Sequence, residues 1–190
     1  MKKKENLKVT SQTIASSKAA QTQLKTSLRN HIDLSAIADN KANIMLSINA
    51  IVITVGLPLI AQRLGANSYY IYPLIALALS SILSMAYATL ATRPIKMSGK
   101  TNLDLIKEKK TNLFFFGNFY KMDFNEYETG IKEVVQKNDI LENSITRDLF
   151  FLGKSLGTKF DYLRSCYNIF MIGMMLTVVL FVVASILGHS

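Results

Sequence analysis

The stretch DLSAIADNKANIMLSINAIVITVGLPLI (residues 33–60) passes from polar sequence into a segment that is almost wholly apolar. No charged residue occurs from 42 to 62, and two further uncharged runs cover 64–92 and 165–188. Because about 20 apolar residues cross the hydrocarbon core of a bilayer, each run is long enough to span it. The sequence therefore predicts three transmembrane helices, at 42–62, 68–92 and 165–188.

The distribution of basic residues predicts how the chain crosses the membrane. Eight of its 22 Lys and Arg residues lie in 1–41 and thirteen lie in 93–164. The loop between the first two spans holds only Arg63, and the tail after the third span holds none. Since cytoplasmic segments next to spans are enriched in Lys and Arg, we expect a cytoplasmic N-terminus and an external C-terminus. The net charge of +9 also suits contact with the anionic lipid bilayer, whereas no motif for docking on a nucleic-acid duplex accompanies it.

The segments outside the bilayer are predicted to be mostly helical. No Gly or Pro interrupts 11–55, so the first span should extend a cytoplasmic helix without a break. Apolar residues recur in steps of three and four from Leu141 to Leu163, the pattern of an amphipathic helix leading into the third span. The expected fold is an all-α membrane protein whose first and last transmembrane helices continue as long cytoplasmic helices. A basic tail and an amphipathic helix fill 1–41, and a mostly helical segment fills 93–164.

Two helix starts and one ambiguous stretch are visible within 93–164. Thr101 followed by Asp104, and Asp123 followed by Glu126, have the spacing of a helix N-cap and its partner three residues on. The aromatic stretch at 112–121 fits either a strand or a packed loop, and the sequence does not separate the two.

Small residues mark the faces on which the spans are expected to pack. Ser80, Ser84 and Ala88 share one face of the second span, and Gly173 and Thr177 share a face of the third. Small side chains at this spacing let transmembrane helices approach closely. Since three spans enclose little interior of their own, we expect any conducting path to form in a homo-oligomer.

No arrangement of residues typical of an enzyme is present. The only histidines, His31 and His189, are expected on opposite sides of the membrane, which leaves too few ligands for a metal site. Cys166 lies in an apolar run without a neighbouring histidine, a setting that leaves a thiol inert. The Gly-Lys pair at 99–100 lacks the earlier glycine of a phosphate loop, because Pro94 occupies that position. We therefore expect no catalytic residue, no metal and no cofactor.

A polar stripe enters the first span. It consists of Asp39, Lys41, Asn43, Ser47 and Asn49, and three of its members (Asp39, Asn43 and Ser47) advance by four residues along one helix face. Polar groups inside a membrane usually face a partner helix or a water-filled space. The stripe is therefore a candidate for interhelical hydrogen bonding, which is the commoner role, or for coupling a signal to a gate or an oligomeric path.

The stretch FFFGNFYK combines five aromatic residues with a lysine. Such aromatic side chains most often indicate core packing or attachment to the membrane surface. They could also stack on a nucleotide base while a cationic side chain meets its phosphate. The candidates for such a site, chosen by charge, aromaticity or position in the stretch, are Phe115, Phe116, Asn118, Lys121, Arg147 and Lys154.

Three segments of the chain resemble the transmembrane effectors of Pycsar antiphage systems: LRNHIDLSAIADNKANIMLSINAIV, NLFFFGNFYKM and ITRDLFFLGKSLGTKFDYLRSCYNIFMIG. The family-specific motifs within them are ADNKAN, FFGNF, LGKSLG and YNIFM. The resemblance implies a multi-pass effector in the bacterial inner membrane that is activated by a cyclic pyrimidine nucleotide, cyclic CMP or cyclic UMP. A partner pyrimidine cyclase would make this nucleotide on infection. Activation would impair membrane integrity and cause abortive infection.

The resemblance leaves the ligand site and the mechanism as hypotheses. The segment between the spans is too short and too helical for a β-barrel nucleotide-binding domain, so the motifs themselves would bind the nucleotide. The long helices would then carry the motion to the polar stripe. On this hypothesis Asn49→Leu or Asp39→Ala abolishes toxicity and leaves nucleotide binding intact. The alternative function is a non-lytic membrane adaptor that anchors a partner cyclase or phosphohydrolase.

Overall fold

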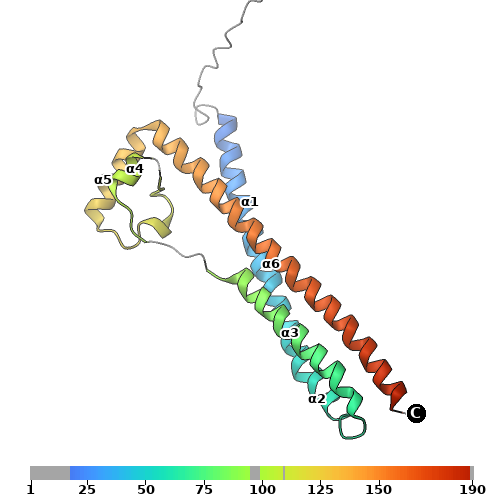
Figure 1. The fold of residues 1–190 in the computed structure, drawn as a ribbon. Coiled ribbons are helices and arrows are strands. Elements are labelled where there is room, and N and C mark those ends of the chain that lie inside the picture. Colours follow the sequence, from blue (N-terminus) through green and yellow to red (C-terminus); the bar gives the residue numbers. More distant parts are fainter. Residues whose placement is uncertain (1–17, 95–98, 109, 189–190) are drawn as a thin grey trace, which may run out of the picture. The chain divides into compact units, whose positions relative to one another are not determined.

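The computed structural model describes residues 18–94, 99–108 and 110–188, and the basic tail expected before residue 18 lies outside this part. The described residues are mostly helical and contain no strand (Figure 1). The all-α class predicted from the sequence is therefore confirmed. The ambiguous stretch at 112–121 is a loop of turns around a short 3₁₀ helix, η4 (Phe116–Asn118).

Two compact units divide the chain, and each has a core of its own. Of the described residues, 32–94 and 153–188 form the membrane unit, and 18–31, 99–108 and 110–152 form the polar unit. Two helices, α1 (Lys18–Ile51) and α6 (Asn138–Leu187), contribute residues to both units.

Within the described part of the chain, three helical stretches are long and apolar enough to cross a membrane, as the sequence predicts. The first begins in α1 and continues through a π-helical turn, η2 (Val52–Gly56), into α2 (Leu57–Ala61). The second is η3 (Ser68–Tyr70) followed directly by α3 (Ile71–Thr92). The third lies in α6, which runs for 50 residues without a break. The expectation that the first and last spans extend long helices is confirmed.

The π-helical turn in the first span was not predicted and has a local cause. Pro58 lacks the N–H that would bond the carbonyl of Thr54, and its ring would crowd that carbonyl. A π turn, in which each N–H bonds one residue further back, accommodates this defect inside a continuous helix. The first span thus continues past Gly56 to the end of α2.

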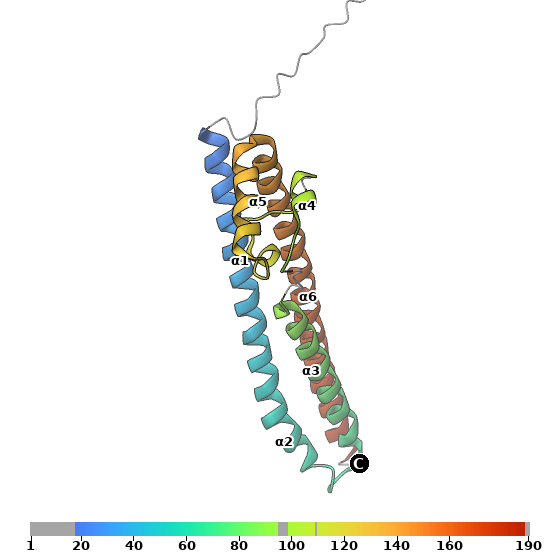
Figure 2. The ribbon, with the colours of Figure 1, turned by 90° about the vertical axis from the view of Figure 1, so that its left-hand side faces the viewer.

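The three spans pack on one another through small residues (Figures 1 and 2). One core cluster joins Ala42 of α1, Ala88 of α3 and Cys166 of α6. The buried face of α3 advances in steps of three and four: Pro73, Leu77, Ser81, Ser84, Ala88 and Ala91. A Cβ added at Gly173 of α6 would lie 2.0 Å from the Cβ of Ser80. The small-residue faces predicted for the second and third spans therefore form a close helix contact.

A second set of contacts joins the start of the second span to the end of α6. The Asn67 side-chain amide donates a hydrogen bond to the Ala184 carbonyl at 2.9 Å, and the hydroxyls of Tyr70 and Ser185 lie 2.9 Å apart. The loop that carries Arg63 and the C-terminal end of α6 therefore lie at the same end of the membrane unit (Figure 2).

The polar unit encloses its own apolar core. It contains α4 (Leu103–Lys107), α5 (Phe124–Gln136) and the first part of α6. The buried side chains of this core are Ile106, Leu113, Val134 and Ile140.

Both predicted helix starts in the polar unit are present, and one cap differs by a residue. Asp123 occupies the N-cap position of α5, as predicted. At α4 the predicted cap Thr101 is wrong, because Asn102 takes the position and its side chain accepts a hydrogen bond from the Leu105 N–H at 2.9 Å. Asparagine is among the best N-cap residues, which explains why the helix begins one residue later than expected.

Candidate functional site

The polar stripe of the first span divides into a buried and an outward-facing part. Asp39 and Asn49 bond residues of other helices, whereas Lys41, Asn43 and Ser47 are exposed on the single chain. The Ser47 hydroxyl donates to the Asn43 carbonyl at 3.1 Å, so its own helix satisfies part of its polarity. The five residues therefore do not share one partner.

Asn49 is fully buried between the three spans. Its side-chain amide donates to the Met45 carbonyl and to the Ser84 hydroxyl, both at 2.9 Å. The Ser84 hydroxyl in turn donates to the Cys166 carbonyl at 3.2 Å. This chain of hydrogen bonds links α1, α3 and α6, which is the association role that polar residues commonly have in membranes.

An ion pair joins α6 to α1 where the first span begins. The Lys159 ammonium lies 2.7 and 2.9 Å from the two carboxylate oxygens of Asp39 and 2.9 Å from the Ser35 hydroxyl. The side chain of Lys159 is only 16% exposed, and that of Asp39 is 40% exposed. A lysine ammonium has three N–H donors, and these three acceptors account for all of them. We call this contact the α1–α6 ion pair.

A cavity of 260 Å³ lies beside this ion pair, between the end of α3 and α6, and we call it the interface cavity. Two cationic side chains, Arg93 and Lys159, contribute to its lining. The other lining residues are Leu90, Pro94, Ser155, Thr158 and Tyr162. Because the described lining holds two cations, three hydroxyl groups and no carboxylate, its chemistry suits an anion.

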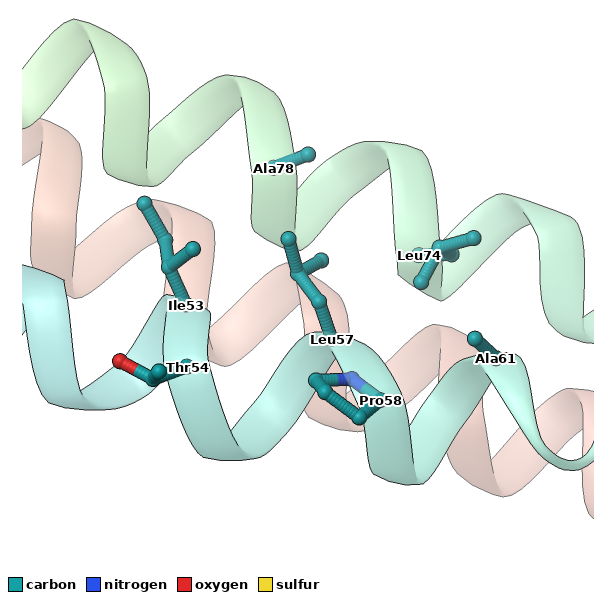
Figure 3. Close-up of a pocket in the computed structure, with 7 residues that line it drawn as sticks. All are labelled: Ile53, Thr54, Leu57, Pro58, Ala61, Leu74 and Ala78. Carbon is teal, nitrogen blue, oxygen red and sulfur yellow. The ribbon is translucent and has the colours of Figure 1, made fainter.

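A second cavity, of 590 Å³, lies between α3 and the segment that contains the π-helical turn (Figure 3). The side chains of Ile53 and Leu57 rise from this segment towards α3, and Leu74 and Ala78 belong to the opposite wall. Its described lining carries no charged side chain, so this cavity does not suit a phosphate-bearing ligand and matches a lipid acyl chain in chemistry.

In the polar unit, Asn112 fixes the aromatic stretch. Its side-chain amide donates to the Asp148 carboxylate on α6, and the Asn118 side chain donates to the Asn112 carbonyl at 2.9 Å. The rings of Phe115 and Phe116 lie 5.2 Å apart, and Phe116 is 55% exposed. These hydrogen bonds fix the loop, so that it presents an exposed aromatic surface. The Asn118 side chain takes part in fixing the loop.

Three cationic residues were predicted to bind a phosphate. In the structure their side chains lie against aromatic rings or in solvent. The Lys121 ammonium lies 5.2 Å from the centre of the Tyr120 ring, and the Arg147 guanidinium lies 5.1 Å from the centre of the Phe151 ring. Lys154 is exposed and belongs to the membrane unit. None of the six predicted nucleotide-binding residues lines either cavity described above, so their role stays a prediction.

Among the described residues, no group of three His, Cys, Asp or Glu side chains could hold a metal ion. His31, the histidine within this part of the chain, has its Nδ1 atom 2.6 Å from the Ser27 carbonyl of its own helix.

Asp148 gives the polar unit a testable pH dependence. Burial raises the pKa of its carboxyl group, and the hydrogen bond from Asn112 opposes this shift only in part. Between its ordinary pKa and the raised value, the folded state holds more protons than the unfolded state, so stability falls as the pH rises through this window. Above this window the full penalty for the half-buried carboxylate is present.

We therefore expect Asp148→Asn to raise the midpoint of thermal unfolding at pH 7, since an asparagine oxygen can still accept from Asn112. The gain should shrink as the pH falls towards 4. Asp161 is an exposed acidic residue of the same helix, and Asp161→Asn should leave the unfolding midpoint unchanged at both pH values. Destabilisation by Asp148→Asn at both pH values would show that the charged hydrogen bond outweighs the cost of burial.

A comparison with protein families supplies the identity of the chain. A model described as the Pycsar effector protein domain, PycTM, matches residues 23–187. The chain belongs to this family. Membership indicates an effector of Pycsar antiphage defence, and the three spans make it a membrane protein. The Pycsar effector domain is not a known catalytic domain.

The matched region includes the polar stripe, the aromatic stretch and the interface cavity of this Pycsar effector. Comparisons with curated proteins and with solved structures found no match.

Sequence reasoning about the effector missed Arg93 and Lys159. A signal for part of the cavity exists in the sequence, because Ser155, Lys159 and Tyr162 follow one another by four and three residues and so share a face of α6. Arg93 gives no such signal, since only the packing of α3 against α6 brings it to this face.

Proposed function

We propose that this Pycsar effector is activated by a cyclic pyrimidine nucleotide, cyclic CMP or cyclic UMP, and then impairs the integrity of the bacterial inner membrane. The infected cell would stop growing before the phage spreads. The observation that carries the proposal is the family match, which takes in all three spans and the segment between them. A partner pyrimidine cyclase would supply the nucleotide.

We also propose a cytoplasmic N-terminus, an external C-terminus and a homo-oligomer. The Lys and Arg counts of the four segments support the orientation. The exposed polar residues of the first span, Asn43 and Ser47, support the oligomer, because polar groups that face lipid are unfavourable. If the first span packed against another copy of the chain, or lined a water-filled path, these side chains would find hydrogen-bond partners.

The aromatic surface of the polar unit is the proposed nucleotide site. The exposed ring of Phe116, which is tilted by 52° against that of Phe115, offers a face for a pyrimidine base, and Lys121 or Arg147 offers a charge for the phosphate. A signal from this site can reach the membrane, since α6 is one continuous helix from Asn138 to Leu187. The polar stripe is the proposed coupling zone.

The proposed switch sets a requirement for binding. A toxic effector must be almost wholly inactive without ligand. Moving a two-state balance from about 1:99 to 99:1 needs about 10⁴-fold tighter binding to the active state, or about 5.5 kcal/mol. Several subunits, each with one nucleotide, would share this free energy.

Thermal stability of the detergent-purified protein with cyclic CMP, UMP, AMP and GMP tests the proposal. Ligand at 100 times its dissociation constant should stabilise the fold by about 2.7 kcal/mol, and we expect this for a pyrimidine nucleotide only. Phe116→Ala should weaken binding by about 5- to 150-fold, because stacking of a base on an aromatic ring is worth about 1–3 kcal/mol. Phe124→Ala, another exposed phenylalanine of the polar unit, should have no effect.

If none of the four nucleotides changes the stability, the proposal fails. The result would favour the alternative function, a non-lytic membrane adaptor that anchors a partner cyclase or phosphohydrolase. The exposed rings of Phe114, Phe116 and Phe150 would then be available for protein contact.

A further inference from the structure

We infer that the interface cavity binds a phosphodiester monoanion, and that this anion competes with Asp39 for Lys159. The anion could be the headgroup phosphate of an anionic lipid or the ring phosphate of a cyclic nucleotide, because both are phosphodiesters with a single negative charge. Binding itself stands without the proposed function, whereas a part in activation would rest on it.

The lining of the cavity matches such an anion. Arg93 supplies a planar guanidinium that can donate two parallel hydrogen bonds to phosphate oxygens. The hydroxyls of Ser155 and Tyr162 add neutral donors on the facing helix. Leu90 and Pro94 give the cavity an apolar side, which suits the carbon skeleton attached to the phosphate.

The side chains around the cavity carry one positive charge that no carboxylate in the described part of the chain neutralises. Lys159 and Asp39 form an ion pair and cancel. None of the ion pairs found among the described residues includes Arg93, which is exposed. A ligand with one negative charge would therefore neutralise the cavity.

The donors of Lys159 make the binding competitive. All three N–H groups of its ammonium are matched by the two oxygens of Asp39 and the hydroxyl of Ser35, at 2.7 to 2.9 Å. A phosphate oxygen can gain a bond from Lys159 only if one of these contacts loosens. The anion would thus weaken the α1–α6 ion pair, and loss of Asp39 would in turn strengthen binding of the anion.

The position of the cavity explains both possible sources of the anion. Arg93 directly follows the last residue of α3, Thr92, at the end of the second span. Lipid phosphates lie at this level of a bilayer. On the proposed topology the same end of the span faces the cytoplasm, where a cyclic nucleotide would appear.

Binding to delipidated protein in a non-ionic detergent tests the inference. The probes are cyclic CMP, cyclic UMP and short-chain dihexanoyl phosphatidylglycerol, with zwitterionic dihexanoyl phosphatidylcholine as the headgroup control. We expect saturable stabilisation by at least one of the three anions, weakened about ten-fold or more by Arg93→Gln because a charge-assisted hydrogen bond is lost. Arg164→Gln removes the same charge from an exposed position of α6 outside the cavity and should bind normally. Asp39→Asn should bind the anion about five-fold more tightly.

The outcomes separate the sources and the two proposals. If binding of a nucleotide is weakened by Arg93→Gln, the nucleotide binds in the interface cavity. If Arg93→Gln weakens binding of phosphatidylglycerol, and no nucleotide shows this dependence, the cavity is a lipid headgroup site. If a nucleotide binds equally well to Arg93→Gln but not to Phe116→Ala, and phosphatidylglycerol does not bind, the inference fails and the proposed function stands. If no anion binds saturably, the inference is overturned.

Discussion

Gly173→Ala should lower the midpoint of thermal unfolding of the detergent-solubilised protein by about 2–12 °C, the range expected for about 1–3 kcal/mol of overpacking. A Cβ at this position would lie 2.0 Å from the Cβ and 2.4 Å from the hydroxyl oxygen of Ser80. The Ser80 Cβ cannot move far, because it is attached directly to the backbone of α3. The helices α3 and α6 would have to separate, which would disturb the packing of the second and third spans.

Two further variants make this prediction specific. Ser80→Gly removes the obstructing side chain, and the nearest remaining atom, the Cα of residue 80, lies at 3.5 Å, an ordinary contact. The double variant Ser80→Gly/Gly173→Ala should therefore recover most of the lost stability. Gly157→Ala, also in α6, has no atom within 4 Å of the added Cβ and should not destabilise the protein. Equal losses for Gly157→Ala and Gly173→Ala would contradict the close contact.

Asp39→Asn should make the protein toxic, or its liposomes leaky, without any nucleotide. The substitution removes the charge that holds Lys159 and so weakens the α1–α6 ion pair by about 1–3 kcal/mol, between the values for exposed and buried pairs. If about 1% of the molecules are active at rest, this loss raises the fraction to about 5–60%. From the sequence alone we expected Asp39→Ala to abolish toxicity, whereas the contact of Asp39 with Lys159 leads us to predict the opposite for Asp39→Asn.

Charge-matched variants test whether the ion pair is responsible. Asp33→Asn removes an exposed acidic side chain of the same helix and should leave the protein silent. The exchange Asp39→Lys/Lys159→Asp restores a pair of opposite charges and should restore silence in the absence of ligand. Growth inhibition on induction in bacteria, with expression levels matched, is the readout. A silent Asp39→Asn variant would show that the ion pair does not hold the resting state.

The spans and the helices that extend them could be predicted because they depend on local composition and periodicity. The same holds for the small faces at Ser80 and Gly173. The π-helical turn before Pro58 could not be predicted in detail, because a proline can be accommodated in several ways within a span.

The partners of the polar residues could not be predicted, because they depend on how the helices rotate and slide on one another. Asn49 was grouped with the polar stripe, and only the structure shows that it is buried and bonds Ser84. Lys154 was expected at a ligand, whereas Lys159, five residues on, lines the interface cavity and pairs with Asp39. Both lysines lie in polar turns of one helix, and only the packed structure distinguishes their environments.

Leakage from proteoliposomes tests the central claim, that a cyclic pyrimidine nucleotide causes this protein to permeabilise a membrane. Purified protein is reconstituted with a trapped fluorescent dye, and cyclic CMP, UMP, AMP and GMP are supplied on both faces of the bilayer. We expect dye release, or loss of an imposed membrane potential, with cyclic CMP or cyclic UMP and not with the purine nucleotides. A nucleotide that binds the protein yet leaves both dye and potential unchanged would contradict the account.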